Sequence, residues 1–415
     1  VISPAHSSGK VVDISGGGIT ANKNIQLYTY NYTPAQYYKI SILNYTSSTD
    51  SIWYKTLTPN DSFTTPLYPS DADKHTLLSY DNISLEKYKA VYDGFVDRGF
   101  EIYSDSVKGK VYATTFVDGE DFYHVYWSYS TRQLRIAEAF GSSDCLPSRG
   151  SVVPKGKIPT ITQLSSTYLN GMGYIITLSD GSFIIVDGGY SDEHDKVYNK
   201  LVELNGGSKD GIIIRAWLIT HAHNDHYECF VSFAKKYASA VTLEYFMYCP
   251  ETPATRRSGW GGIFTWGEIY DYINLFSGTK TLIVHTGMEF KFGDVYMEIL
   301  YAPDDMIIDF IPDNQNEYSI VSRFYTKTKS ALLLGDAGND VATRFEYNYG
   351  TYLKSDICQA AHHGVEDFPL STYNLIKAPI MFYPCDQELY DSNSRFNDVR
   401  EAIASSDYIK EILIH

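Results

Sequence analysis

Four potential metal ligands fall within six consecutive positions of the segment THAHNDH, residues 220–226. His221, His223 and His226 offer imidazole nitrogens and Asp225 offers a carboxylate, a set that suits zinc and also iron or manganese. His221 and His223 are two residues apart, so on extended backbone they face the same side. Asp225 and His226 can then turn toward a second point. The segment therefore predicts part of a metal site.

Further potential ligands follow other apolar runs. ALLLGDAG places Asp336 after one run, where its carboxylate could bridge two metals, and DICQAAHHG places His362 and His363 after another. We expect one histidine of this pair to bind metal, and the sequence leaves open which one. The other could contact the substrate or protonate a leaving group. Asp187 ends FIIVDGG and is expected to brace the ligand loop, with a plain turn residue as the alternative.

These residues need elements that bring them to one place. An α/β fold does so, because loops at the carboxyl ends of its strands meet at one edge of the sheet. The apolar run IIIRAWLI before THAHNDH is typical of a buried strand. Strands and helices alternate after residue 158, which predicts a layered α/β domain over 158–415. The expected strands are 160–166, 173–178, 182–187, 211–220, 242–248, 281–285, 295–302, 319–326, 331–336, 357–362, 380–384 and 408–415, and the expected helices are 191–204, 228–238, 266–276 and 394–405.

The chain before this domain has a different character. The stretch LPSRGSVVPKGKIP, residues 146–159, holds three prolines and two glycines and is typical of a linker. Ahead of it we expect a helix over 87–100 and four alternating strands over 101–105, 110–117, 123–129 and 133–139. This pattern predicts a small α+β module over 80–145.

Composition limits the classes of partner. The formal net charge is −16, so nucleic acid is a poor partner unless a local basic patch exists. The five cysteines are widely spaced without a CxxC pair, which indicates neither a disulfide framework nor a cysteine zinc site. No apolar run approaches the roughly 18 residues of a membrane span. No signal peptide is visible at the start, VISPAHSSGK.

The motifs FIIVDGG, LITHAHNDH, LLLGDAG and AAHHG occur in this order, and through them residues 158–415 resemble the metallo-β-lactamase superfamily. The resemblance implies an αββα sandwich with a one- or two-metal site at one edge. It implies two zinc ions, or manganese or iron, with Asp336 as the bridge. The remaining ligands would be His221 and His223 on the first metal, and Asp225, His226 and one of His362 and His363 on the second.

NEYSIV, ALLLGDAG and ICQAAHHG are similar to the metallohydrolase domain of DNA-uptake competence proteins and of bacterial phosphorylcholine esterases. Relatives in that branch commonly have an asparagine pair before the strand, and here Glu317 replaces one asparagine. Many family members also place a histidine between the second motif and the bridging aspartate. His285 in LIVHTG is the only histidine between residues 226 and 362, but it lacks the usual glycine-flanked context. It is a candidate contact to metal or substrate.

The N-terminal residues 9–40 carry a second resemblance, to one repeat of the ricin-type β-trefoil lectins. Asp13, Gln26, Tyr28 and Gln36 fall at the sugar-contact and Gln-x-aromatic positions of such a repeat. A trefoil needs three repeats and only one is visible, so the prediction is a partial lectin-like repeat over 1–45. It would bind carbohydrate or survive as a structural unit only. It favours a secreted or cell-surface bacterial protein.

Two metals about 3.5 to 4 Å apart can hold a water whose pKa falls toward about 7. The expected function is therefore a metal-dependent hydrolase that uses a metal-bound hydroxide, with Asp225, His362 and His363 as catalytic candidates. A phosphodiesterase acting on a cell-surface or small phosphodiester is the leading expectation. A lactonase or β-lactamase-like hydrolase is the alternative enzyme. A carbohydrate-binding surface protein with a vestigial metal domain is the alternative outside enzymes.

The insert ETPATRRSGWGGIFTW, residues 251–266, offers candidate substrate contacts. Arg256, Arg257 and Trp260 could grip an anionic or planar substrate, because guanidinium groups bind phosphate oxygens and stack on rings. The alternative is a solvated loop with a packed tryptophan.

Overall fold

The computed structural model describes residues 10–14, 25–29, 51–64, 75–149, 156–166, 168, 170–249, 266–303, 315–364, 368–392 and 397–414. The chain divides into two compact units, Val1–Thr49 and Asp50–His415. In the first unit, strands β1 (Lys10–Ile14) and β2 (Ile25–Thr29) pair antiparallel, with Asp13 opposite Gln26. Tyr28 lies in β2, whereas Gln36 lies outside the described residues.

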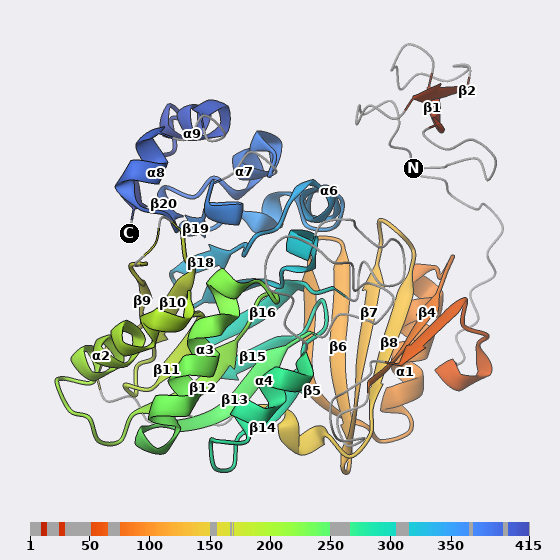
Figure 1. Cartoon of the computed structure of the whole chain (residues 1–415). Helices are drawn as coiled ribbons and strands as arrows, with labels where there is room; N and C mark the ends of the chain where they lie inside the picture. The colour runs from red at the N-terminus through yellow and green to blue at the C-terminus, as the bar shows by residue number, and fades with distance from the viewer. Residues whose placement is uncertain are drawn as a thin grey trace. The chain divides into compact units, whose positions relative to one another are not determined.

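Two packed sheets make up most of the second unit (Figure 1). The first sheet has the order β14-β13-β12-β11-β10-β9. Its antiparallel strands β9 to β11 lead into the parallel run β11 to β14. Strand β11 is buried throughout, and β12 to β14 are buried and apolar toward their carboxyl ends. The bounds are β9 Thr160–Gln163, β10 Gly173–Thr177, β11 Phe183–Asp187, β12 Ile213–Leu218, β13 Thr242–Tyr248 and β14 Lys280–Ile283.

The second sheet follows the chain order from β15 to β21. It begins antiparallel and becomes parallel from β18 onward. Its inner face packs against the first sheet, where the rings of Tyr174 and Phe382 stack with centroids 6.0 Å apart. The bounds are β15 Glu289–Phe292, β16 Val295–Tyr301, β17 Val321–Tyr325, β18 Ser330–Leu333, β19 Ile357–Gln359, β20 Ile380–Tyr383 and β21 Glu411–Ile414.

Helices cover the outer faces of both sheets (Figure 1). Apolar side chains of α2, α3 and α4 join the core of the first sheet, and those of α6, α7 and α9 join the core of the second. This arrangement is the αββα sandwich expected from the sequence. The bounds are α2 His194–Leu204, α3 Asn224–Tyr237, α4 Trp266–Ile273, α6 Asn339–Asn348, α7 Leu370–Ile376, α8 Gln387–Ser392 and α9 Asn397–Ala404.

A third, antiparallel sheet with the order β3-β4-β8-β7-β6-β5 packs beside the sandwich. Helix α1 buries Val91 and Phe95 on one face of this sheet, and Ser84 caps the helix by accepting from the Lys87 N–H at 3.2 Å. Residues of β6 and β7 on the other face belong to the sandwich cores. The bounds are α1 Leu85–Val96, β3 Asp61–Thr64, β4 His75–Tyr80, β5 Glu101–Lys108, β6 Val111–Asp118, β7 Asp121–Ser128 and β8 Leu134–Ala139.

The mixed α/β fold class is confirmed, and three details differ from the sequence expectation. Helix α3 begins at Asn224 inside THAHNDH, not at residue 228, so Asp225 and His226 lie in its first turn. The short strand β15 and the helices α6, α7 and α8 were not expected; α6 is rich in polar residues, and β15, α7 and α8 are brief. Strands β3 and β4 extend the third sheet before residue 80. Among the described residues, no helix is both long and apolar enough to span a bilayer.

Candidate metal centre

The histidines and aspartates of interest come from the ends of neighbouring strands. Asp187 ends β11, and THAHNDH joins β12 to α3 beside it. In the second sheet, Asp336 follows β18, and His363 follows β19, its parallel neighbour. The two packed sheets therefore bring four loops to one edge of the sandwich.

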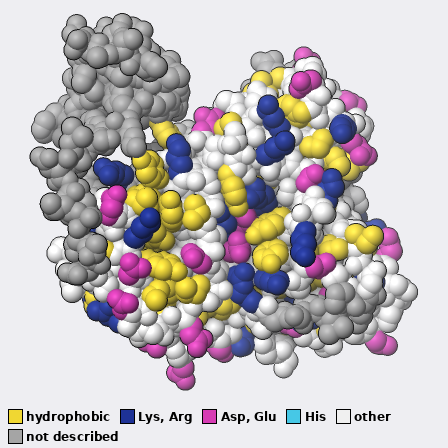
Figure 2. All heavy atoms as spheres, turned by 180° about the vertical axis from the view of Figure 1, so that it is seen from behind, with side chains coloured by type: hydrophobic (Ala, Val, Ile, Leu, Met, Phe, Trp, Pro, Cys, Tyr) yellow, Lys and Arg dark blue, Asp and Glu magenta, His cyan; other side chains and the backbone are white. Residues whose placement is uncertain are grey.

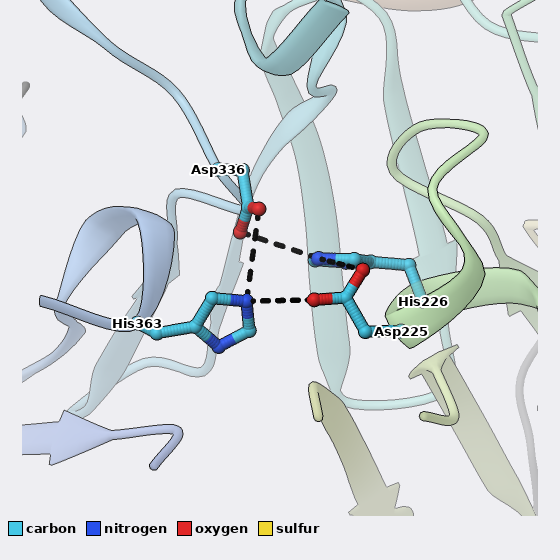
Figure 3. Close-up of side chains that lie close together, drawn as sticks. All are labelled: Asp225, His226, Asp336 and His363. Carbon is cyan, nitrogen blue, oxygen red and sulfur yellow. Dashed lines mark ion pairs between the residues drawn. The ribbon is translucent and has the colours of Figure 1, made fainter. Parts of the chain in front are cut away.

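These loops form two groups of ligand atoms that share one carboxylate. Asp225, His226, Asp336 and His363 make the first group, with ligand atoms within 4.8 Å of one another. Figure 3 shows His226 Nε2 and His363 Nε2 facing Asp336, at 3.3 and 3.7 Å from its carboxylate oxygens. The second group consists of His221, His223 and Asp336.

In the first group, the Nδ1 atom of each histidine makes a hydrogen bond to an oxygen of the protein. His226 Nδ1 lies 2.8 Å from Asp187 Oδ2, and His363 Nδ1 lies 2.8 Å from the Pro384 carbonyl oxygen. Because a carboxylate and a carbonyl oxygen accept hydrogen bonds, both Nδ1 atoms donate. The Nε2 atoms are then available as ligands, which is the usual arrangement around a metal-binding histidine.

Three buried polar atoms of this cluster make no hydrogen bond to any described residue: His226 Nε2, His363 Nε2 and Asp336 Oδ1. Their polar neighbours lie at ion-pair distances, 3.3 Å from His226 Nε2 to Asp336 Oδ1 and 3.2 Å from His363 Nε2 to Asp225 Oδ2. Burial of polar atoms whose hydrogen bonds are not satisfied is costly. A divalent cation would satisfy all three together, since imidazole nitrogens and carboxylate oxygens are its usual protein ligands. The donor set therefore fits a metal centre, in which Asp336 can serve both positions.

The Asp187 side chain holds the loop 220–226 in place by hydrogen bonds. Its carboxylate accepts from the Thr220 N–H and Thr220 Oγ1, each at 2.8 Å, as well as from His226 Nδ1. Its backbone lies in the left-handed region, with φ of 56°, which is uncommon for a residue other than glycine. Trp217 Nε1 donates to its carbonyl at 2.9 Å and helps to hold this conformation.

Replacing Asp187 with asparagine is expected to weaken metal binding about 10- to 100-fold, the usual cost of losing a residue that orients a ligand. The new amide would point N–H groups at His226 Nδ1, so that histidine would move its proton to Nε2, the atom that faces Asp336. Competition with a chromophoric chelator measures the affinity. Asp180→Asn is the control, because Asp180 precedes β11 and pairs with Arg215 at 2.9 Å. Equal affinities in the two variants would contradict the role of Asp187.

The acidic residues set the protonation of the histidines in metal-free protein. Burial alone would lower the pKa of His226, but Asp336, Asp187 and Asp225 raise it well above its usual value. Burial also opposes the charge on His363, and Asp336 and Asp225 nevertheless raise the pKa of that ring. His221 behaves oppositely, since burial and the neighbouring His226 lower its pKa well below the usual range. Without metal, protons on His226 and His363 therefore offset the buried carboxylates.

A raised histidine pKa stabilises the fold fully below the unfolded value of about 6.5 and loses this contribution as pH rises through the folded value. We therefore expect the melting temperature of chelator-treated protein to fall as pH rises above about 6.5. The lowered pKa of His221 acts below that window and does not oppose the trend. Metal-loaded protein should show a smaller fall, because the metal replaces these protons. The buried cysteines, whose pKa values burial raises, affect both forms alike. Calorimetry of the metal-free and metal-loaded forms across this pH range measures the effect. A melting temperature of chelated protein that rises with pH would contradict the expectation.

His362 lies beside the first group but outside it. Its side chain is 23% exposed, and its Nε2 lies 3.9 Å from Asp336 Oδ2 and 3.0 Å from Asn316 Nδ2. His363, in contrast, is buried with Nε2 3.2 Å from Asp225 Oδ2. Both histidines have positive φ, 48° and 56°, which is uncommon for residues other than glycine. In this turn the His363 side chain is buried and the His362 side chain is partly exposed. Geometry thus favours His363 as the ligand and leaves His362 at the rim.

Other residues singled out in the sequence lie elsewhere. The structure does not bring His285 into either group. Its Nε2 lies 2.8 Å from His75 Nδ1 on β4, and its ring stacks near His124. This cluster joins the sandwich to the third sheet. Arg256, Arg257 and Trp260 lie outside the described residues.

Sequence reasoning missed several residues that support the ligands. Thr220 contacts Asp187, Ser319 Oγ lies 3.2 Å from His221 Nδ1, and Asn170 Nδ2 donates to Asp225 Oδ2 at 2.9 Å. Thr220 and Ser319 lie in the motifs THAHNDH and NEYSIV, whereas Asn170 had no signal in the sequence.

Solved structures of metallo-β-lactamase fold proteins are similar to this chain. YhfI from Bacillus subtilis is 12% identical over 62% of this chain and 97% of its own, with a TM-score of 0.39. The diiron β-hydroxylase CmlA from Streptomyces venezuelae is 13% identical over 61% of this chain and 52% of its own, with a TM-score of 0.38. Yeast PDE1 is 12% identical over 61% of this chain and 96% of its own, with a TM-score of 0.35. No protein-family model and no curated protein matches the chain. We therefore take the chemistry of the site from its own residues.

Proposed function

We propose that this chain is a metal-dependent hydrolase, and specifically a zinc phosphodiesterase. The observation that carries the proposal is the pair of histidine and aspartate groups that share Asp336, with buried Nε2 and Oδ1 atoms that make no hydrogen bond within the described residues. A site with two groups around one carboxylate suits two metal ions. The three histidines of THAHNDH, together with His363, make zinc the favoured metal, and manganese or iron are alternatives.

Two metal ions bound there would make a water nucleophilic at neutral pH and neutralise charge that develops on the substrate. The protein's own part is to hold the ligand atoms and to supply donors at the rim. His362 Nε2 and Asn316 Nδ2 lie 3.0 Å apart beside Asp336. Asn316 Nδ2 can only donate, so His362 Nε2 accepts its N–H in this contact. The Asn316 amide can hydrogen-bond a phosphoryl oxygen, and His362, once protonated and turned from Asn316, can give a proton to the leaving oxygen.

This rim favours a phosphodiester over a lactone or a β-lactam. A phosphodiester carries an anionic group, which an amide N–H and a protonated histidine match better than they match a neutral carbonyl. Bulk nucleic acid is a poor fit, because the chain carries a net charge of −16. On the face in Figure 2, Lys and Arg side chains are interspersed with Asp and Glu. A small or cell-surface phosphodiester is the proposed substrate; the cell-surface setting, and carbohydrate binding through residues 1–45, rest on the lectin-like repeat alone.

A substrate panel tests this proposal. Zinc-loaded protein would be assayed with bis(p-nitrophenyl) phosphate, p-nitrophenyl phosphate, an acyl homoserine lactone and a chromogenic cephalosporin. The expected result is the highest kcat/KM for the diester. Faster turnover of the lactone or the cephalosporin would favour the alternative hydrolase. Tight metal binding without turnover of any substrate would favour a vestigial metal domain.

A further inference from the structure

Glu317 places a buried carboxylate against the start of helix α6. Its oxygens accept hydrogen bonds from the backbone N–H groups of Gly338 at 3.2 Å, Asp340 at 3.2 Å and Val341 at 3.1 Å. A helix leaves its first N–H groups without partners inside the helix, and a negative charge is favourable at this end. Glu317, in the 3-10 turn η8 (Gln315–Tyr318), thus caps α6 from a distant part of the chain.

The contact leaves little freedom between the two segments. A Cβ atom on Gly338 would clash with Glu317 Oε1, so glycine allows the backbone to approach the carboxylate this closely. The Tyr301 hydroxyl donates to the Glu317 carbonyl at 2.8 Å and holds the turn from the other side. Glu317 is therefore a fixed anchor for the backbone at Gly338.

The anchored backbone is the one that carries Asp336, two residues before Gly338. The Asp336 N–H donates to Ser319 Oγ at 3.0 Å, and Ser319 Oγ also lies 3.2 Å from His221 Nδ1. The segment 317–319 therefore contacts Asp336 at its own N–H and at the residues that follow it. It also contacts a histidine of the second group.

We propose that Glu317 is a positioning residue for Asp336, the carboxylate that both ligand groups share. It touches neither ligand group directly and acts through the backbone of residues 336–341. Loss of its carboxylate should free the start of α6, let Asp336 turn away, and weaken metal binding at both positions. The inference rests on the proposed metal centre and does not depend on which substrate the centre hydrolyses.

The test compares Glu317→Ala and Glu317→Gln with the wild-type chain. Competition with a chromophoric chelator gives metal affinity, and the visible spectrum of cobalt-substituted protein reports ligand geometry. We expect about tenfold or greater loss of affinity in Glu317→Ala, the low end of what orienting residues contribute, with an altered cobalt spectrum. The metal affinity of Glu317→Gln should lie between those of the wild-type chain and Glu317→Ala, because its one carbonyl oxygen can replace only part of the carboxylate's accepting capacity.

Ser84→Ala is the matched control, because it removes a cap from helix α1, which packs on the third sheet. It should lower the melting temperature and leave metal affinity unchanged. Wild-type affinity and spectrum in folded Glu317→Ala would overturn the inference alone. If that variant does not fold, the same result in Glu317→Gln overturns it. A wild-type chain that binds no metal would overturn the proposed centre and this inference with it.

Discussion

Replacing Asp336 with asparagine is expected to weaken metal binding at both positions and to lower turnover by about a thousandfold or more. Asp336 is the one residue common to both ligand groups. Its carboxylate is 2% exposed and lies within 4 Å of His221, His226, His362 and His363. Asparagine keeps the volume but removes the charge and one accepting oxygen. Stabilisation of transition-state charge by metal ions is worth several kcal/mol, and each 1.36 kcal/mol is a factor of about ten in rate.

Metal analysis and turnover of bis(p-nitrophenyl) phosphate measure this effect together. Asp356→Asn is a close control, since Asp356 precedes β19 and pairs with Lys329 at 2.9 Å and with the Ser330 N–H at 2.9 Å. That variant should keep both metals and full turnover. An Asp336→Asn protein with two metals and unchanged turnover would contradict the shared role of Asp336.

Substitutions of the adjacent histidines His362 and His363 provide the second large effect, because one should lose metal and the other should lose only turnover. His363→Ala is expected to lose a metal, since His363 Nε2 lies 3.2 Å from Asp225 in the buried group. His362→Ala should keep its metals, because this side chain is partly exposed and lies outside both groups. Its turnover should still fall about a hundredfold or more, the scale of general acid catalysis.

Metal content separates these two variants, and each serves as the control for the other. Metal loss in His362→Ala with retention in His363→Ala would reverse the assignment of ligand and rim residue.

Much of the sandwich could be predicted from periodicity. FIIV and IIIRAWL are mostly apolar because β11 is buried and its parallel neighbour β12 is buried at most positions, with Arg215 as the polar exception, so their strand character is visible without the structure. The placement of Asp187, THAHNDH, Asp336 and His363 after such strands followed from the same pattern. Helix α3 began earlier than expected because its first turn consists of polar residues with a role at the site.

The choice between His362 and His363 could not be made from the sequence. Both follow the same strand, and both residues have left-handed backbone. Only the contacts in the folded chain, His363 with Asp225 and His362 with Asn316, show which ring enters the buried cluster. The contacts of Thr220, Ser319 and Glu317 depend on how loops distant in sequence meet. His285 follows a strand like the ligands, but β14 lies at the edge of the first sheet and its loop meets the third sheet.

The most direct test of the central claim is a metal titration followed by activity. Zinc would be added in steps to chelator-treated protein, and turnover of bis(p-nitrophenyl) phosphate would be measured at each step. We predict that turnover rises with added zinc, saturates near two ions per chain and is lost again with chelator. Two bound ions without turnover, or equal turnover in chelated and loaded protein, would contradict a two-metal phosphodiesterase.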